Sequence, residues 1–170
     1  YSHRVGYMLE KIGIESDMSF ESPLVSLITC TNRPEMLPNI LRNYNHQTWD
    51  NRELIVVIDC NDNEFQNIDQ SLEHQQNVTV HKVPSGLSLG HCFNIGMELS
   101  KGNYIAKFDD DDLYGPNYIA DQLLPFKYTD ADIVGKLCTF MYNEKSEKTY
   151  LRFPKNRHKY GCLLYTSDAA

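Results

Sequence analysis

Short runs of consecutive apolar residues alternate along the chain with longer segments in which apolar side chains recur at helical spacing. The runs predict buried strands, at residues 24–28, 54–58, 78–83, 104–108 and 133–137. The segments that follow the first four runs predict helices, at residues 34–44, 65–72, 89–97 and 115–126. Because continuous apolar strands joined by helical crossovers are typical of a parallel sheet, we expect an α/β fold with helices on both faces.

The two ends of the chain lack this alternation. Residues 1–23 are largely polar, which indicates the tail of an upstream segment. Residues 161–170 carry neither a strand nor a helix pattern and resemble translated sequencing adaptor, so we interpret them as an aberrant tail. We therefore expect one incomplete domain over residues 24–160, truncated at its C-terminal side and derived from a longer protein.

Composition and charge narrow the class of ligand and the compartment. The 16 Lys and Arg residues are outnumbered by 23 Asp and Glu residues, and the net charge of −7 argues against nonspecific nucleic-acid binding. An anionic ligand would therefore need a local source of positive charge, such as a metal ion.

No apolar run approaches the roughly 20 residues of a membrane span, and no signal-peptide stretch is present. We expect a cytoplasmic protein without a transmembrane segment, peripheral at the membrane in its full-length form.

The cysteines are odd in number and widely spaced, with no C-x-x-C pair. This pattern argues against a disulfide framework and against a zinc site, and it predicts reduced, mostly buried thiols. The residues concerned are Cys30, Cys60, Cys92, Cys138 and Cys162.

Polar side chains follow the first three predicted strands, and ligands of parallel sheets bind beyond the carboxyl ends of the strands. Thr31 and Asn32 could contact a heterocycle or cap the next helix, and Asp59 could accept from a nucleobase or form an Asx turn. Residues 84–96 lack the glycine spacings of a dinucleotide-binding loop and of a P-loop, which disfavours both classes. The candidates for nucleotide binding in these segments are Cys30, Thr31, Asn32, Arg33, Asp59 and Ser88.

Four consecutive acids, Asp109 to Asp112, directly follow the fourth predicted strand. Adjacent carboxylates repel one another and raise their own pKa values unless a cation or a hydrogen-bond network compensates. Mg²⁺ and Mn²⁺ prefer such oxygen ligands and are commonly bound through one or two carboxylates together with substrate phosphates. The acids therefore predict a divalent metal site, and a solvated acidic turn is the alternative.

The set of motifs resembles the GT-A nucleotide-sugar-binding domain of inverting family 2 glycosyltransferases over about residues 25–142. The resemblance implies a Rossmann-like, mainly parallel sheet and a site that binds a UDP-sugar with Mg²⁺ or Mn²⁺. It further implies that Asp59 reads the nucleobase, that Asp109 faces the ribose, and that Asp111, with Asp109, holds the metal. The motifs follow the four strands in order, as Val25–Arg33, Asp59, Gly90–Gly96 and the acids Asp109, Asp111 and Asp112.

The resemblance also implies the reaction, which is inverting transfer of a sugar to a hydroxyl of a glycan or another acceptor. Residues 111–118 and 134–136 resemble a bacterial subgroup associated with surface polysaccharides. Phe93 stands where the family often has Arg. The family's general base is a carboxylate well downstream of the metal site, where the pattern is missing. We therefore expect donor binding with little transfer, and the acids to examine if transfer occurs are Asp130, Asp132 and Glu144.

Two other classes of function stay open at this point. A Mg²⁺-dependent phosphohydrolase could use Asp109 and Asp111 as nucleophile and acid. Such motifs usually carry Thr or Val two residues after the second acid, where this chain has Leu113. A non-catalytic module that binds a nucleotide, a sugar or a cation is the other alternative.

Overall fold

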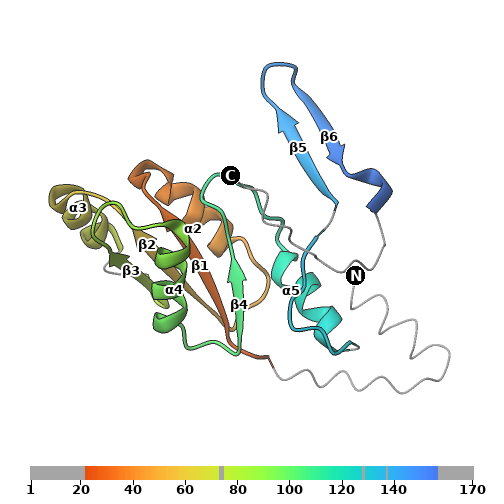
Figure 1. The fold of residues 1–170 in the computed structure, drawn as a ribbon, viewed down its shortest axis with the longest axis horizontal. Helices are drawn as coiled ribbons and strands as arrows, with labels where there is room; N and C mark the ends of the chain where they lie inside the picture. The colour runs from red at the N-terminus through yellow and green to blue at the C-terminus, as the bar shows by residue number, and fades with distance from the viewer. Residues whose placement is uncertain (1–21, 73–74, 128, 137, 157–170) are drawn as a thin grey trace. The chain divides into compact units, whose positions relative to one another are not determined.

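The computed structural model describes residues 22–72, 75–127, 129–136 and 138–156. The chain divides into two compact units, and the boundary lies between Leu124 and Pro125. The first unit contains a parallel sheet with its helices, and the second contains an antiparallel hairpin (Figure 1). The predicted tails, residues 1–23 and 161–170, lie almost wholly outside the described residues.

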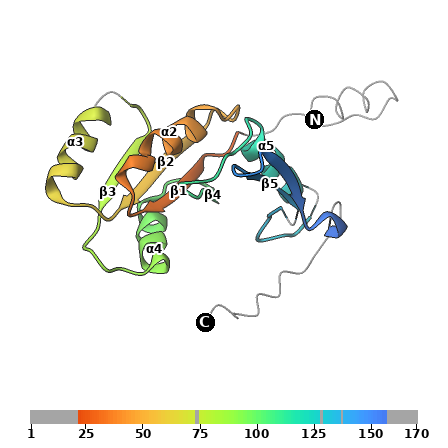
Figure 2. The ribbon, with the colours of Figure 1, turned by 90° about the horizontal axis from the view of Figure 1, so that it is seen from above.

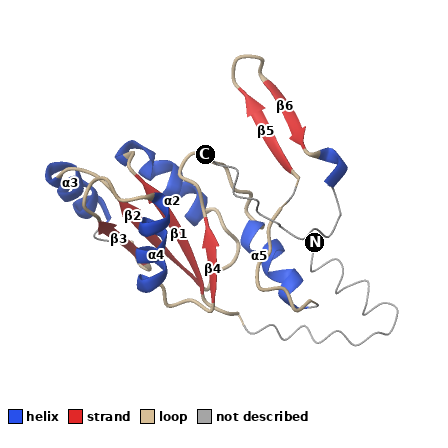
Figure 3. Ribbon diagram, in the orientation of Figure 1, coloured by secondary structure: helices blue, strands red, loops and turns tan. Residues whose placement is uncertain are grey.

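The first unit is built on a four-stranded sheet in the order β3-β2-β1-β4, and every neighbouring pair is parallel (Figure 3). The two central strands are buried along nearly their whole length, which explains why their sequences are largely apolar rather than alternating. These four strands confirm the first four predicted ones. Their bounds are β1 Val25–Thr31, β2 Arg52–Ile58, β3 Val78–Lys82 and β4 Tyr104–Lys107.

Helices cover both faces of this sheet, as predicted. Figure 2 shows α2 and α4 on opposite sides of the strands. The cause is the right-handedness of crossovers between parallel strands. The chain first moves outward from β1 through β2 to β3 and then returns past β1 to β4. Because the direction of travel reverses, the helix of the return crossover lies on the opposite face of the sheet. The helical segments are η1 Pro34–Met36, α2 Leu37–Asn45, α3 Asp62–Leu72, α4 Leu89–Leu99, α5 Tyr118–Leu123 and η2 Leu124–Lys127.

Helix α4 packs closely on the sheet because Gly96 carries no side chain. A Cβ atom at this position would lie 2.5 Å from Ile28 Cγ2, whereas one at Gly90 on the same helix would meet nothing within 4 Å. We expect Gly96→Ala to lower the free energy of unfolding by about 1–3 kcal/mol through overpacking. The matched change Gly90→Ala should cost nothing, since Ala favours helix over Gly. Urea unfolding of both variants measures this difference, and equal stability would contradict it.

The fifth predicted strand is wrong. Residues 133–136 form no strand, Ile133 is 79% exposed, and residue 137 lies outside the described residues. A hairpin forms instead between β5 Thr139–Asn143 and β6 Lys148–Arg152, followed by η3 Pro154–Asn156. The physical reason is that Gly135 and the neighbouring Lys weaken the short apolar run, whereas the aromatic-rich segments after it can pair across a tight turn.

Two further expectations concern cysteines and membranes. In the part of the chain that the structure describes, the thiols of Cys30, Cys60, Cys92 and Cys138 are free, and those of Cys60 and Cys92 are buried. Cys162 lies outside that part. The described helices include none that is both long and apolar enough to cross a membrane.

Candidate functional site

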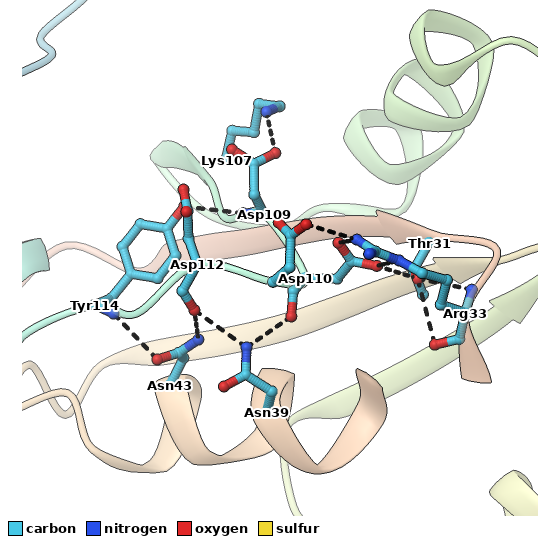
Figure 4. A network of polar contacts seen from close by, with 10 residues as sticks. Thr31, Arg33, Asn39, Asn43, Lys107, Asp109, Asp110, Asp112 and Tyr114 are labelled. Carbon is cyan, nitrogen blue, oxygen red and sulfur yellow. Dashed lines mark hydrogen bonds and ion pairs between the residues drawn. The ribbon is translucent and has the colours of Figure 1, made fainter. Parts of the chain in front are cut away.

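The loops that follow β1 and β4 meet at the carboxyl edge of the sheet (Figure 4). Strands β1 and β4 are neighbours, and the strand order reverses between them, because the chain leaves β1 toward β2 but reaches β4 from β3. Such a reversal is the topological switch point at which open α/β sheets bind their ligands. Thr31, at the end of β1, and Arg33, in the loop after it, contact Asp110 of the second loop, and Arg33 also contacts Asp111.

Asp110 is the member of the acidic run that turns inward, and only 7% of it is exposed. Its carboxylate accepts hydrogen bonds from Thr31 Oγ1, from Arg33 Nε at 3.1 Å and from Arg33 Nη2 at 2.5 Å. Burial opposes ionisation of this carboxyl, but the bonds from Arg33 and Thr31 outweigh it and hold the pKa of Asp110 below its ordinary value. Asp110 therefore ties the two loops together as an anion.

The two predicted metal ligands lie on either side of Asp110 and are half-exposed. Lys107 Nζ is 2.5 Å from Asp109 Oδ1, and Arg33 Nη2 is 3.0 Å from Asp111 Oδ2. The basic side chains and the hydrogen bonds on Asp110 offset the mutual repulsion of the acids. Asp109 and Asp111 are thus accessible anionic oxygen donors on a loop whose middle residue is buried.

An aromatic cluster supports the same loop. The rings of Phe108 and Tyr114 stack with centroids 3.8 Å apart, and Tyr118 meets both rings edge-on. Burial raises the pKa of Tyr114, so its hydroxyl stays neutral and accepts a hydrogen bond from the Asp109 backbone N–H at 2.9 Å. The loop therefore closes back on itself around Asp109.

Helix α2 and the segment directly after it hold the other side of the loop through a row of three amide side chains. Asn39 and Asn43 lie four residues apart on one face of α2, and Gln47 lies two residues beyond the end of the helix at Asn45. All three donate hydrogen bonds to backbone carbonyl groups of the loop, and Asn43 and Gln47 are buried. The carbonyl groups belong to Asp110, Asp112 and Gly115.

Asp59 lies at the end of β2, where it contacts the loop that follows β3. Its Oδ1 accepts from Ser85 Oγ at 2.6 Å, and its Oδ2 lies 3.4 Å from the Gly86 backbone N–H. Gly86 has φ +91°, a conformation that L side chains rarely adopt and that brings its N–H toward the carboxylate. The structure therefore gives Asp59 a fixed orientation at the same edge of the sheet as the acidic loop.

The remaining nucleotide-binding candidates have different surroundings. Ser88 caps α4, since its Oγ accepts from the His91 backbone N–H at 3.3 Å, and Asn32 is exposed. Cys30 packs against the cluster beneath α4, where burial raises the pKa of its thiol to about 11. Phe93 packs against that same cluster, which accounts for an apolar residue at this position.

The sequence patterns did not single out Asp110, the amides of Asn39, Asn43 and Gln47, or Tyr114. The signal that was available for Asn39 and Asn43 is their spacing of four on a predicted helix. The downstream acids Asp130, Asp132 and Glu144 are exposed in the second unit.

The acidic loop fits a divalent metal through the chemistry of its donor set. Within the described residues, no three side chains of His, Cys, Asp or Glu converge as a preformed metal cage. Mg²⁺ and Mn²⁺, however, often take only one or two protein carboxylates and complete their coordination with substrate phosphates and water. Asp109 and Asp111 provide that number of accessible carboxylates.

Comparison with known proteins gives a family match and a curated relative. Residues 26–165 match the family model described as "Glycosyl transferase family 2". The putative glycosyltransferase EpsH of Bacillus subtilis is 30% identical over 123 residues, which cover 71% of this chain. The match spans 34% of EpsH, so the chain corresponds to about a third of that relative.

Solved structures share the fold. A mannosyltransferase from Pyrobaculum calidifontis, in complex with GDP-Man and Mn²⁺, matches 78% of this chain and 41% of its own, with TM-score 0.55 and 17% identity. S. aureus TarS 1-349 in complex with UDP-GlcNAc matches 66% of this chain and 37% of its own, with TM-score 0.52 and 19% identity. These likenesses confirm the predicted α/β fold of the GT-A type.

Proposed function

The chain belongs to glycosyl transferase family 2, and we propose that its first unit binds a nucleotide-diphospho-sugar together with a divalent cation. The observation that carries this proposal is the meeting of the β1 loop and the acidic loop at the switch point of the sheet. A ligand there would have Thr31, Arg33 and Asp59 on the nucleotide side and Asp109 and Asp111 on the diphosphate side. Family membership favours this function over a phosphohydrolase.

The proposed roles follow from charge. Asp109 and Asp111 would hold Mg²⁺ or Mn²⁺, which when bound neutralises the diphosphate as it leaves the sugar. Arg33 already contacts Asp110 and Asp111, so its guanidinium lies where it can shift from Asp111 toward a phosphate oxygen while it keeps Asp110. Such a shift would free a carboxylate oxygen of Asp111 for the metal.

We propose a uridine diphosphate donor, and the complex of TarS with UDP-GlcNAc supports this choice. The Pyrobaculum relative in complex with GDP-Man makes guanosine diphosphate the competing donor. Calorimetry with UDP, GDP and ADP, each with and without Mn²⁺, distinguishes them. Tighter Mn²⁺-dependent binding of UDP than of GDP and ADP supports the proposal. If none of the three nucleotides binds in a Mn²⁺-dependent way, the proposal is overturned.

Asp59→Ala should weaken binding of UDP more than binding of pyrophosphate, both measured with Mn²⁺. The reason is that the proposed contact of Asp59 is to an N–H of the base, which pyrophosphate lacks. A hydrogen bond to a charged group contributes about 1.5–3 kcal/mol, so the expected loss for UDP is about tenfold or more. Equal losses for the two ligands would instead mean that Asp59 acts only by holding the loop at Ser85 and Gly86.

We further propose that the whole protein transfers the sugar, with inversion, to a hydroxyl of a bacterial surface polysaccharide or a related acceptor. The required general base would come from a carboxylate downstream of the acidic loop. A cytoplasmic location, peripheral at the membrane, suits a protein that uses nucleotide-activated donors to build such polymers.

A further inference from the structure

The amide row, with Asn39 and Asn43 on α2 and Gln47 just beyond its end, donates hydrogen bonds to carbonyl groups of the acidic loop and of the residues that follow it. Asn39 Nδ2 lies 2.7 Å from the carbonyl oxygen of Asp110 and 3.1 Å from that of Asp112. Asn43 Nδ2 lies 2.8 Å from the same oxygen of Asp112. Gln47 Nε2 lies 3.0 Å from the carbonyl oxygen of Gly115.

The oxygen end of each amide also has a partner, and this fixes which way the amide faces. Asn43 Oδ1 accepts from the Tyr114 backbone N–H at 3.1 Å, and Gln47 Oε1 accepts from the Ile119 N–H at 3.2 Å. Arg42 Nη2 donates to Asn39 Oδ1 at 2.5 Å. Each amide nitrogen is therefore held toward the loop, and the row forms a connected polar network.

This network decides where the backbone of the acids lies. Asn39 holds the carbonyl groups of Asp110 and Asp112, which flank the proposed metal ligand Asp111 on both sides. Four like charges in sequence would favour an extended loop that separates them. The amides oppose that separation through neutral donors and leave the carboxylates of Asp109 and Asp111 accessible.

We propose that Asn39, Asn43 and Gln47 are positioning residues that set the affinity of the acidic loop for a divalent cation bound with a nucleoside diphosphate. The inference rests on the proposed function of the loop and adds the side chains that set its affinity for the cation. Loss of one outer partner of a metal site commonly costs 10- to 100-fold in metal affinity. Loss of the Asn39 amide should therefore reduce the gain in UDP affinity caused by Mn²⁺ by about tenfold or more.

The test uses Asn39→Ala and the isosteric Asn39→Asp, which keeps an acceptor for Arg42 but removes the donor to the loop. Asn45→Ala is the matched control, because Asn45 is an exposed asparagine on the same helix. Calorimetry with UDP, with and without Mn²⁺, gives the ratio of the two affinities for each variant. Hydrogen exchange of residues 110–114 reports on the loop without any ligand.

We expect both Asn39 variants to lose most of the Mn²⁺-dependent gain, to keep their metal-free UDP affinity and to exchange faster at residues 110–114. The control should match the parent in all three measurements. A merely structural role would lower metal-free and Mn²⁺-dependent binding together and leave the ratio unchanged. Asn39 variants with the full Mn²⁺ gain overturn this inference alone, whereas a parent chain without any Mn²⁺ gain overturns the proposed function and this inference with it.

Discussion

Asp111→Asn should abolish Mn²⁺-dependent binding of UDP while the protein stays folded. The Asp111 side chain is 56% exposed and contributes little to the core, so the amide should be tolerated. Divalent cations of this class require hard anionic oxygens, and an amide offers only a neutral one. Since loss of an outer partner already costs 10- to 100-fold, loss of a direct ligand should cost about 100-fold or more.

Calorimetry with UDP and Mn²⁺, beside thermal unfolding, measures this change. Asp121→Asn is the matched control, because Asp121 is an exposed aspartate of the same unit on α5, outside the acidic run. The control should bind UDP with Mn²⁺ as the parent does. If Asp111→Asn keeps the Mn²⁺-dependent affinity of the parent, Asp111 is not a metal ligand.

The centre of the sheet was predictable because β1 and β2 are buried on both faces. The run at 54–58 is continuous and apolar, and the structure buries it completely at the centre of the sheet. The run at 133–137 has similar residues but contains Gly135, and no strand forms over 133–136. In Thr139–Asn143 the exposed aromatic residues Phe140 and Tyr142 flank Met141, and this pattern shows neither a continuous apolar run nor a clear polar face.

The gathering of the candidate residues at one edge of the sheet was predictable, but the different surroundings of the four acids were not. The rule that ligands bind at the carboxyl ends of parallel strands placed Thr31, Asp59 and Asp109 at one edge. Which of four identical side chains turns inward depends on the path of the loop. That path is set by contacts from residues about 70 positions away, such as Asn39 to Asp110. Local pattern therefore identified the loop, and only the tertiary structure distinguishes Asp110 from its neighbours.

Asp110→Asn should destabilise the first unit, in contrast to Asp111→Asn. The carboxylate of Asp110 is buried and accepts bonds from Thr31 and Arg33, whereas an amide would turn donors toward the Arg33 guanidinium. Hydrogen bonds between charged groups contribute about 1.5–3 kcal/mol, so we expect a loss of about 2 kcal/mol in the free energy of unfolding at neutral pH. Urea unfolding measures it.

The loss caused by Asp110→Asn should shrink in acid. The folded pKa of Asp110 lies below the ordinary value of 3.8, so the stabilisation is complete above that value and is lost as the pH falls through the folded pKa. Asn resembles the protonated acid, and parent and variant should therefore converge as the pH falls through the folded pKa of Asp110. Asp62→Asn is the control, because its pKa is also lowered, by Lys82, but its side chain is 88% exposed and its removal should change stability little. A difference between parent and Asp110→Asn that stays constant from neutral to acidic pH would show that the ionised carboxylate does not hold the two loops together.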